Sequence, residues 1–218
     1  MKKNTRKLKK AALLLCSAVL LVCISIGATV AYLTSHDTVT NTFTVGKVAI
    51  TMDEAKANAD GTLDTTVTDR VKGNSYKLMP GHTYTKDPII HAATGSEDCW
   101  LFVKVENGIA DIEDPYDTIA KQMTELGWSE VTSGSGIYAY DRIVKAGENI
   151  PVFAHFTISD DVVGGMEPIT TDGAGDDGKL YLDKYKNAQI VITAYAIQAD
   201  GFSTAYAAWT AAGSSFTA

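Results

Sequence analysis

The sequence predicts an all-β protein, an antiparallel β-sandwich with one or two short peripheral helices. Three observations predict it. Nearly every periodic segment alternates polar and apolar residues with period two, which is the pattern of half-buried strands. Turn residues recur at intervals typical of a sandwich. No internal repeat or proline-rich linker interrupts the chain, so residues 32–218 are expected to form a single domain.

Residues 1–31 have the order of a secretory signal peptide. Six basic residues between Lys2 and Lys10 precede an uncharged apolar run of 16 residues from Ala11 to Ile26, and small residues follow. The run is short for a membrane-spanning helix, which needs about 20 apolar residues. The uncharged stretch continues to Leu33, however, so an uncleaved anchor is the alternative. Such an anchor would be the only expected contact with a membrane.

The expected cleavage point follows Ala31, with Thr29 two residues before it. Both side chains are small enough for the shallow pockets of a signal peptidase. Cleavage after Ala28 or slightly later is the alternative. Cutting after Ala31 would make Tyr32 the new N-terminus and would place the mature chain outside the cell.

Charge and cysteine content narrow the function classes. The whole chain has 19 basic and 26 acidic residues, a formal charge of −7. Loss of the six basic residues of the signal leaves 13 against 26, a charge of −13. A chain this acidic repels nucleic acid and anionic membranes. Beyond the signal only Cys99 remains, so no intrachain disulfide is expected, and its alternating apolar surroundings predict a buried, inert thiol.

Residues 43–52 are the expected first strand of the domain. Its core-facing residues are Phe43, Val45, Val48 and Ile50. The alternation changes phase at Gly46, which predicts a β-bulge or a kink between two halves of the strand.

Further strands are expected at residues 82–92, 99–106, 137–144, 151–158 and 189–198, with weaker patterns at 65–71 and 75–78. Pro80 and Gly81 predict a turn before the first of these, because Pro presets φ and Gly accepts a positive φ. The first two are expected to pair with each other. Both faces of residues 189–198 are apolar, which predicts a central strand buried on both sides.

Two helices are expected. Asp114 would cap the first, Pro115 would occupy its first position, and Gly127 would end it in a left-handed conformation. Ser203 would cap a second, shorter helix at residues 203–212.

Three segments together resemble one family. The signal and its exit, IGATVAYLTSHDTVTNTFTVGKVAITMDE, resemble exported proteins cut by the SipW-type signal peptidase. The middle segment KLMPGHTYTKDPIIHAATGSEDCWLFVKVEN is similar to the Pro-Gly turn and following strands of the TasA and camelysin (CalY) family. The ending ITAYAIQADGFSTAYAAW resembles the closing strand and tail of that family.

The resemblance implies a jelly-roll β-sandwich secreted by a Gram-positive bacterium, whose subunits self-associate into biofilm-matrix fibres. In such fibres the N-terminal strand of one subunit completes the sheet of the next. Here that donor strand would be residues 32–41, with Tyr32, Leu33 and Val39 as its apolar groups. The chain is shorter than a typical TasA, and its length is nearer that of camelysin.

The residues themselves also favour assembly. A short alternating segment with no covalent partner before it need not fold back on its own subunit. An unpaired sheet edge exposes backbone donors and acceptors that a strand of another chain can satisfy. Each ladder bond contributes only about 1 kcal/mol net, so stable fibres also need donor side chains in core pockets. The alternative is that residues 32–41 form a disordered leader or pair within their own subunit.

Two other function classes remain open. One is a monomeric cell-surface binding or accessory protein. The other is a zinc metalloprotease of the camelysin type. This class is less favoured, because such a site commonly needs two His one helical turn apart with a Glu between them. The histidines are His36, His82, His91 and His155. None lies within four residues of another, so no catalytic residues and no enzyme activity are expected.

No cofactor is expected, although calcium is a weak candidate. Asp172, Asp176 and Asp177 lie among glycines, which gives close carboxylates on a flexible backbone. Calcium takes about six to eight oxygen ligands, and the alternating spacing of an EF-hand is absent here. A solvated loop is the favoured interpretation.

Overall fold

The computed structural model describes residues 16–17, 47–165 and 179–213. The chain divides into two compact units, Met1–Thr44 and Val45–Ala218. Of the first unit, two residues in helical conformation are described, Cys16 and Ser17. In the described parts of the chain, no helix has both the length and the apolar character that crossing a membrane requires.

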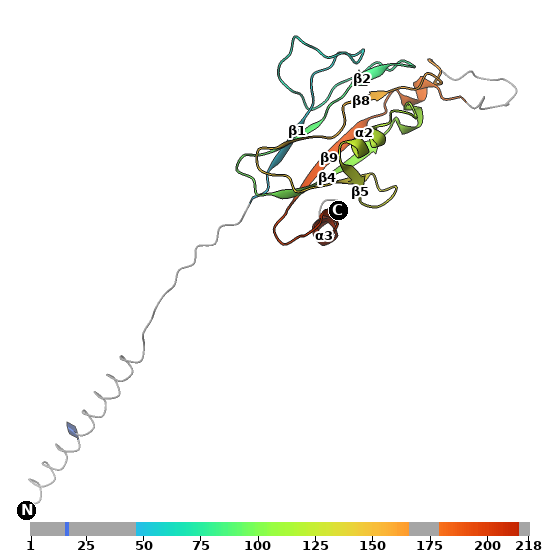
Figure 1. Ribbon diagram of the computed structural model, residues 1–218. Coiled ribbons are helices and arrows are strands. Elements are labelled where there is room, and N and C mark those ends of the chain that lie inside the picture. The colour runs from blue at the N-terminus through green and yellow to red at the C-terminus, as the bar shows by residue number, and fades with distance from the viewer. Residues whose placement is uncertain (1–15, 18–46, 166–178, 214–218) are drawn as a thin grey trace, which may run out of the picture. The chain divides into compact units, whose positions relative to one another are not determined.

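The second unit is built from short antiparallel strands, and this confirms the all-β class (Figure 1). The strands are β1 (Ile50–Asp53), β2 (Thr83–Thr85), β3 (Ile89–Ala92), β4 (Cys99–Asn107), β5 (Trp128–Glu130), β6 (Ile137–Tyr140), β7 (Asn149–Pro151), β8 (His155–Thr157) and β9 (Ile190–Gln198). The helices are α2 (Ile119–Glu125), α3 (Ala205–Ala212) and the 3-10 turns η1 (Ala110–Ile112) and η2 (Leu182–Tyr185).

Two sheets pack on a common core. One has the strand order β1-β3-β7, the other has the order β5-β6-β4-β9, and β2 pairs separately with β8. Every strand pair is antiparallel. Ile90 of β3, Leu101 of β4 and Ile150 of β7 belong to one apolar cluster, which places the core between the two sheets. A smaller cluster around Phe102 and Ala208 lies between β4, β9 and α3.

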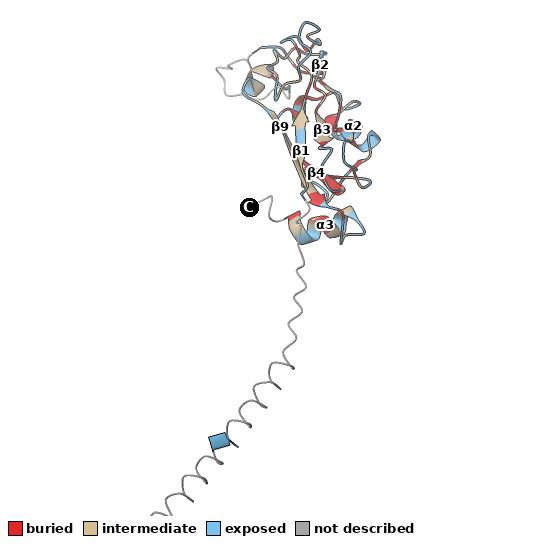
Figure 2. Cartoon of the chain, turned by 90° about the vertical axis from the view of Figure 1, so that its left-hand side faces the viewer, coloured by how far each residue is buried: buried red, intermediate tan, exposed pale blue. Residues whose placement is uncertain are grey.

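The two sheets are tied together along one side. There β5 meets β7, and the indole Nε1 of Trp128 donates to the carbonyl of Pro151 at 2.9 Å. Helix α2 adds Gln122, whose Nε2 donates to the carbonyl of His155 at 3.1 Å and whose Oε1 accepts the amide of Ala154. The other side is bounded by β1 and β9, the outer strands of their sheets, and most of their residues are only partly buried (Figure 2).

The position of β9 corrects one prediction. Apolar residues on both faces predict a central strand, but β9 is an edge strand. Both of its faces are covered, one by the main core and the other by α3. The pattern of apolar side chains indicates that both faces of the strand are covered. It does not indicate whether the strand has one neighbour or two, because strands pair through backbone groups that every residue has.

The predicted pairing of residues 82–92 with 99–106 is wrong. Residues 82–92 form two strands, because Pro88 cannot donate to a ladder and separates β2 from β3. β3 then pairs with β1 and β7, whereas β4 pairs with β6 and β9. Residues 93–98 carry the chain from one sheet to the other. In the same way residues 151–158 divide into β7 and β8, with Ala154 exposed between them.

Both predicted helices are present, but their starts differ from the prediction. The hydroxyl of Thr118, and not Asp114, accepts an amide of the first turn of α2. Asp114 instead accepts the amide of Tyr116 in the preceding turn. Thr204 rather than Ser203 caps α3. Because Ser, Thr and Asp are all good caps, a sequence that offers several of them in a row does not decide which one is used.

A buried carboxyl lies where the chain enters α2. Glu113 is 8% exposed, and its Oε1 accepts the amide of Ile119 at 3.3 Å. Burial raises the pKa of this carboxyl to about 7, and repulsion from Asp117 adds a smaller contribution in the same direction. The folded state therefore holds a proton on Glu113 that the unfolded chain has already released.

This carboxyl should make stability depend on pH. Because its pKa is raised on folding, its stabilising contribution is fully present below the ordinary value of 4.5 and is lost as pH rises through about 7. We expect the stability of Glu113→Gln relative to the parent to increase between pH 5 and pH 8, by a few kcal/mol at about 1.4 kcal/mol for each pKa unit. Urea unfolding of both proteins at pH 5 and pH 8 measures this. An equal difference at both pH values would contradict it.

Candidate functional site

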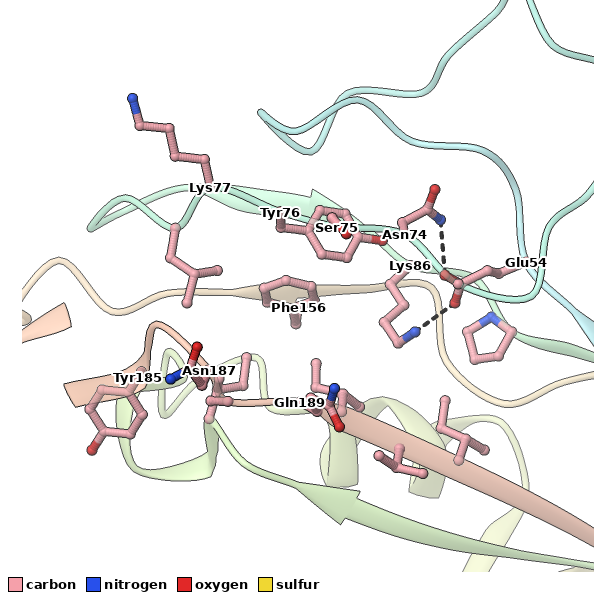
Figure 3. Close-up of a pocket in the computed structure, with 18 of the residues that line it drawn as sticks. Glu54, Asn74, Ser75, Tyr76, Lys77, Lys86, Phe156, Tyr185, Asn187 and Gln189 are labelled. Atoms are coloured by element: carbon pink, nitrogen blue, oxygen red, sulfur yellow. Dashed lines mark hydrogen bonds and ion pairs between the residues drawn. The ribbon is translucent and has the colours of Figure 1, made fainter. Parts of the chain in front are cut away.

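A groove with a volume of about 880 Å³ opens on the side between β9 and β1. Its walls come from the end of β1, from residues 72–78 and from residues 185–192. Figure 3 shows Phe156 between two walls, with Tyr76 on one side and Tyr185 on the other. The groove therefore has an aromatic and apolar base within a partly polar rim.

The backbone of β9 forms a free edge along this side. At one end of the strand, the amide of Gly108 donates to the carbonyl of Gln189 at 2.9 Å. At the other end, the amide of Ala199 donates to the carbonyl of Asp98 at 2.8 Å. Such pairs alternate along an antiparallel ladder, so every second residue between them turns its backbone groups away from β4.

The residues with outward backbone groups are Ile190, Ile192, Ala194, Ala196 and Gln198. Within the described ranges, no strand pairs with this outer edge. Four of the five also carry apolar side chains that pack against the main core but are only partly buried. On the neighbouring β4, by contrast, Leu101 and Val103 are completely buried. The open edge thus leaves both backbone groups and apolar side chains incompletely covered.

One wall of the groove is the end of a long excursion between β1 and β2, residues 55–78, which we name the strap. Weak strands are predicted at residues 65–71 and 75–78, but the strap contains no regular strand. At the start of residues 65–71 the carboxylate of Asp64 accepts the amide of Thr66, and this local bond competes with strand pairing; Asp60 binds the amide of Thr62 in the same way.

Charged side chains fasten the strap to β1. The guanidinium of Arg70 pairs with Asp53 at 2.5 Å and with Asp87 at 3.1 Å. The ammonium of Lys72 donates to the carbonyl of Met52. These contacts occupy the end of β1 that borders the groove, so β1 offers little to an incoming strand, whereas β9 offers an edge of nine residues.

A buried ion pair lies in the groove wall. The ammonium of Lys86 is 2.6 Å from a carboxylate oxygen of Glu54, and the two side chains are 10% and 5% exposed. From the strap, the side-chain amide of Asn74 donates to the other oxygen of Glu54 at 2.9 Å and to the carbonyl of Ala55 at 2.8 Å (Figure 3). This cluster ties the strap to both flanking segments of the sheet.

Tyr76 joins the strap to the base of the groove. Its hydroxyl donates to the carbonyl of Thr85 at 2.7 Å, and its ring meets Phe156 edge-on with 5.2 Å between ring centres. Burial, together with the nearby charge of Glu54, raises the pKa of this phenol well above its ordinary value. Tyr76 therefore remains a neutral hydrogen-bond donor.

Some of the residues singled out from the sequence can be placed. Val48 and Ile50 pack against the main core and are partly buried. Pro80 and Gly81 lie in a turn, with a φ of +71° at the glycine. Outside the described residues lie Thr29, Ala31, Tyr32, Leu33, Val39, Phe43, Val45, Asp172, Asp176 and Asp177, together with His36.

The described histidines lie apart from one another. His91 contacts Asp53 and Asn149 through its two ring nitrogens, and the hydrogen bond to Asp53 raises the pKa of this imidazole. His155 contacts Asp117 at 2.6 Å. Across the described ranges, no cluster of three His, Cys, Asp or Glu side chains is placed to hold a metal ion.

Cys99 is completely buried, as its alternating apolar surroundings predict. Burial raises the pKa of its thiol to about 11, so the reactive thiolate is strongly disfavoured.

Sequence reasoning did not find the groove, because its walls come from segments far apart in the chain. One signal was available. Lys86 shares the alternating spacing of Tyr84, Pro88 and Ile90 along a strand pattern, and a charged residue on such an apolar face needs a partner. The sequence does not reveal that the partner is Glu54.

Comparison of the chain with protein-family models, with curated proteins and with solved structures finds no match in any of the three. Function must therefore be inferred from the groove and from the open edge of β9.

The ion pair in the groove wall gives a test of the site's construction. We expect Lys86→Met to destabilise the protein by about 3–5 kcal/mol, because Glu54 would keep a buried charge without its partner. The double variant Glu54→Leu with Lys86→Met should regain most of this loss. Lys104→Met is the matched control, since its exposed pair with Glu106 should contribute less than about 1 kcal/mol. Equal losses for the two lysine variants in urea unfolding would contradict the expectation.

Proposed function

We propose that this protein is a secreted structural subunit of extracellular biofilm-matrix fibres and that it assembles by strand exchange. Residues 32–41 of one subunit would add to β9 of the next. The observation that carries this proposal is the outer edge of β9, where outward backbone groups and half-buried apolar side chains occur in the same residues and no described strand pairs with them. An extended peptide that adds to a sheet edge satisfies both at once.

The energetics of the edge support such an addition. Each new ladder bond contributes about 1 kcal/mol net, and five residues of β9 turn their backbone groups outward. Covering Ile190 and Ile192 adds apolar burial at about 25 cal/mol per Å². The donor segment has suitable residues, since Tyr32, Leu33 and Val39 are apolar and three of the other seven residues are Thr, which favours strands.

Within this proposal the fold is a jelly-roll β-sandwich of the TasA and camelysin type, completed by the incoming strand. A signal peptidase of the SipW type would cut after Ala31 and release Tyr32 as a free N-terminus. Before the cut, the donor segment is continuous with the apolar run at residues 11–26. Export would thus precede assembly and place the fibres at the surface or in the matrix of a Gram-positive bacterium.

A second candidate is a monomeric cell-surface binding or accessory protein. The observation that favours it is the size of the groove, because about 880 Å³ lies within the range of small-molecule sites. This candidate requires a monomer at all concentrations and a ligand of defined chemistry, so the experiments on assembly separate the two.

Filament formation tests the proposal directly. We expect purified chains that begin at Tyr32 to form filaments visible by electron microscopy, because they carry the donor strand. Chains that begin at Thr42 lack it and should remain monomeric. If both remain monomeric, or if both polymerise equally, strand exchange by residues 32–41 is wrong.

The acceptor edge can be tested in the chain that begins at Tyr32. We expect Ala196→Lys to abolish filaments, because a charge on an edge strand opposes strand addition. Ala120→Lys, on the exposed face of α2, is the matched control and should leave assembly unchanged. Ala194→Pro is a second variant, since it removes an outward amide and no bond to β4. Circular dichroism melts establish that each variant folds; filaments from folded Ala196→Lys and Ala194→Pro would contradict the proposal.

A further inference from the structure

The groove beside β9 has the opposite charge to the chain as a whole. The sequence has a formal charge of −7. The Lys, Asp and Glu side chains of the groove lining give it a net charge of +2, and they are Lys72, Lys77, Lys86, Lys186, Asp53 and Glu54. A cleft lined by an excess of one sign of charge attracts ligands of the other sign.

The two acids of the lining already have cationic partners. Asp53 contacts the guanidinium of Arg70 and a ring nitrogen of His91. Glu54 is paired with Lys86 at 2.6 Å, so this lysine is occupied as well. Neither acid of the lining is left to bind a cation, which disfavours a cationic ligand.

The other three lysines of the lining keep most of their charge for a ligand. The ammonium of Lys72 donates to the carbonyl of Met52, which is a neutral acceptor. Lys186 lies 3.8 Å from Asp183, which is a long ion pair between two exposed side chains. Lys77 is exposed and makes no ion pair with a described residue. Such weakly held ammonium groups remain available to an incoming anion.

These lysines come from two walls of the groove. Lys72 and Lys77 belong to the strap, whereas Lys186 follows η2. In Figure 3 the ammonium of Lys77 lies outside the groove, at the end of a flexible stem that can turn toward a bound anion. Asn187 and Gln189 are exposed beside Lys186 and add neutral amide donors. A negative group at the mouth of the groove therefore meets donors from both walls.

The base of the groove favours an apolar body. Tyr76 and Phe156 meet edge-on there. Ile190 and Ile192 line the same groove and are partly buried. Aromatic rings pack well against other rings in offset or edge-to-face arrangements. A ligand with a ring and a negative group would thus match both the base and the mouth.

The surrounding charge limits the size of the ligand. A long polyanion would extend beyond the groove onto the surface of an acidic chain, which repels it. A small molecule can place its negative charge at the mouth alone. The groove volume of about 880 Å³ lies within the range of small-molecule sites.

We propose that the groove is a binding site for a small organic anion with an aromatic body. The body lies against Tyr76 and the isoleucines of β9, and the negative group lies at the mouth among Lys72, Lys77 and Lys186. This inference goes beyond strand exchange, because it assigns a class of ligand to the groove of a single subunit.

Two fluorescent probes that share an aromatic body test the proposal. Anilinonaphthalene sulfonate carries a negative group, and phenylnaphthylamine lacks it. Both are titrated into the chain that begins at Thr42, which contains the whole second unit and lacks the segment proposed to add to β9. We expect the anionic probe to bind at one site per chain, about tenfold more tightly than the neutral probe, at a low ionic strength of about 0.01 M, where screening is weak.

Two double variants with the same net charge separate the groove from the rest of the surface. Lys77→Glu with Lys186→Glu reverses two charges at the mouth. Lys121→Glu with Lys145→Glu is the matched control, because these exposed lysines do not line the groove. We expect the first variant to weaken binding of the anionic probe about tenfold, since nearby opposite charges attract and like charges repel. It should leave the neutral probe unchanged, and the control should affect neither probe.

Circular dichroism melts establish that each variant folds. Equal affinity of the parent for the two probes would overturn the preference for an anion. Equal losses in the two double variants would overturn the role of the lysines at the mouth. Absence of binding of the anionic probe to the folded parent would overturn the site itself. Strand exchange stands or falls separately, on the filaments of the chain that begins at Tyr32.

Discussion

The outer edge of β9, with which no strand of the described residues pairs, is the constraint on which the rest of the structure depends. Amides and carbonyls in a strand with both faces covered can turn only to water or to another strand at its edge. β9 has the main core on one face and α3 on the other, yet it ends its sheet. Soluble proteins usually keep such edges short or charged. Here the edge is nine residues long and its inward side chains are apolar, which favours addition of a strand.

The strap gives the opening its asymmetry. In the proposed assembly, an added strand would lie beside β9, on the side of the domain that β1 also borders. Arg70 and Lys72 close the groove end of β1, and the buried pair of Glu54 with Lys86 holds the strap in place. Among the described residues, β9 is thereby left as the edge that is open to a further strand. In the proposed assembly, the polar cluster would act through the shape of the groove and would not need to contact the donor.

The sequence predicts well which faces of a strand are buried, but it predicts poorly which strands pair with each other. Cys99, Leu101 and Val103 alternate in the sequence and are all completely buried, so the face of β4 is read correctly. The sequence does not predict the edge position of β9 or the partners of β3, because pairing depends on backbone groups that all residues share. For the proposed site, the sequence predicts the donor half as a strand-like segment after an expected signal, and residues 32–41 lie outside the described residues. The acceptor half depends on the contact of Glu54 with Lys86, 32 residues apart, which no local pattern predicts.

Charge and burial have separate roles in the proposed fibre. Removal of residues 1–31, as proposed, would change the formal charge from −7 to −13, so the cut that frees the proposed donor strand would also increase repulsion between copies. At physiological ionic strength this repulsion is screened beyond about 8 Å, whereas backbone bonds and apolar contacts in the groove hardly respond to salt. Stability of the fibre must therefore come from the groove.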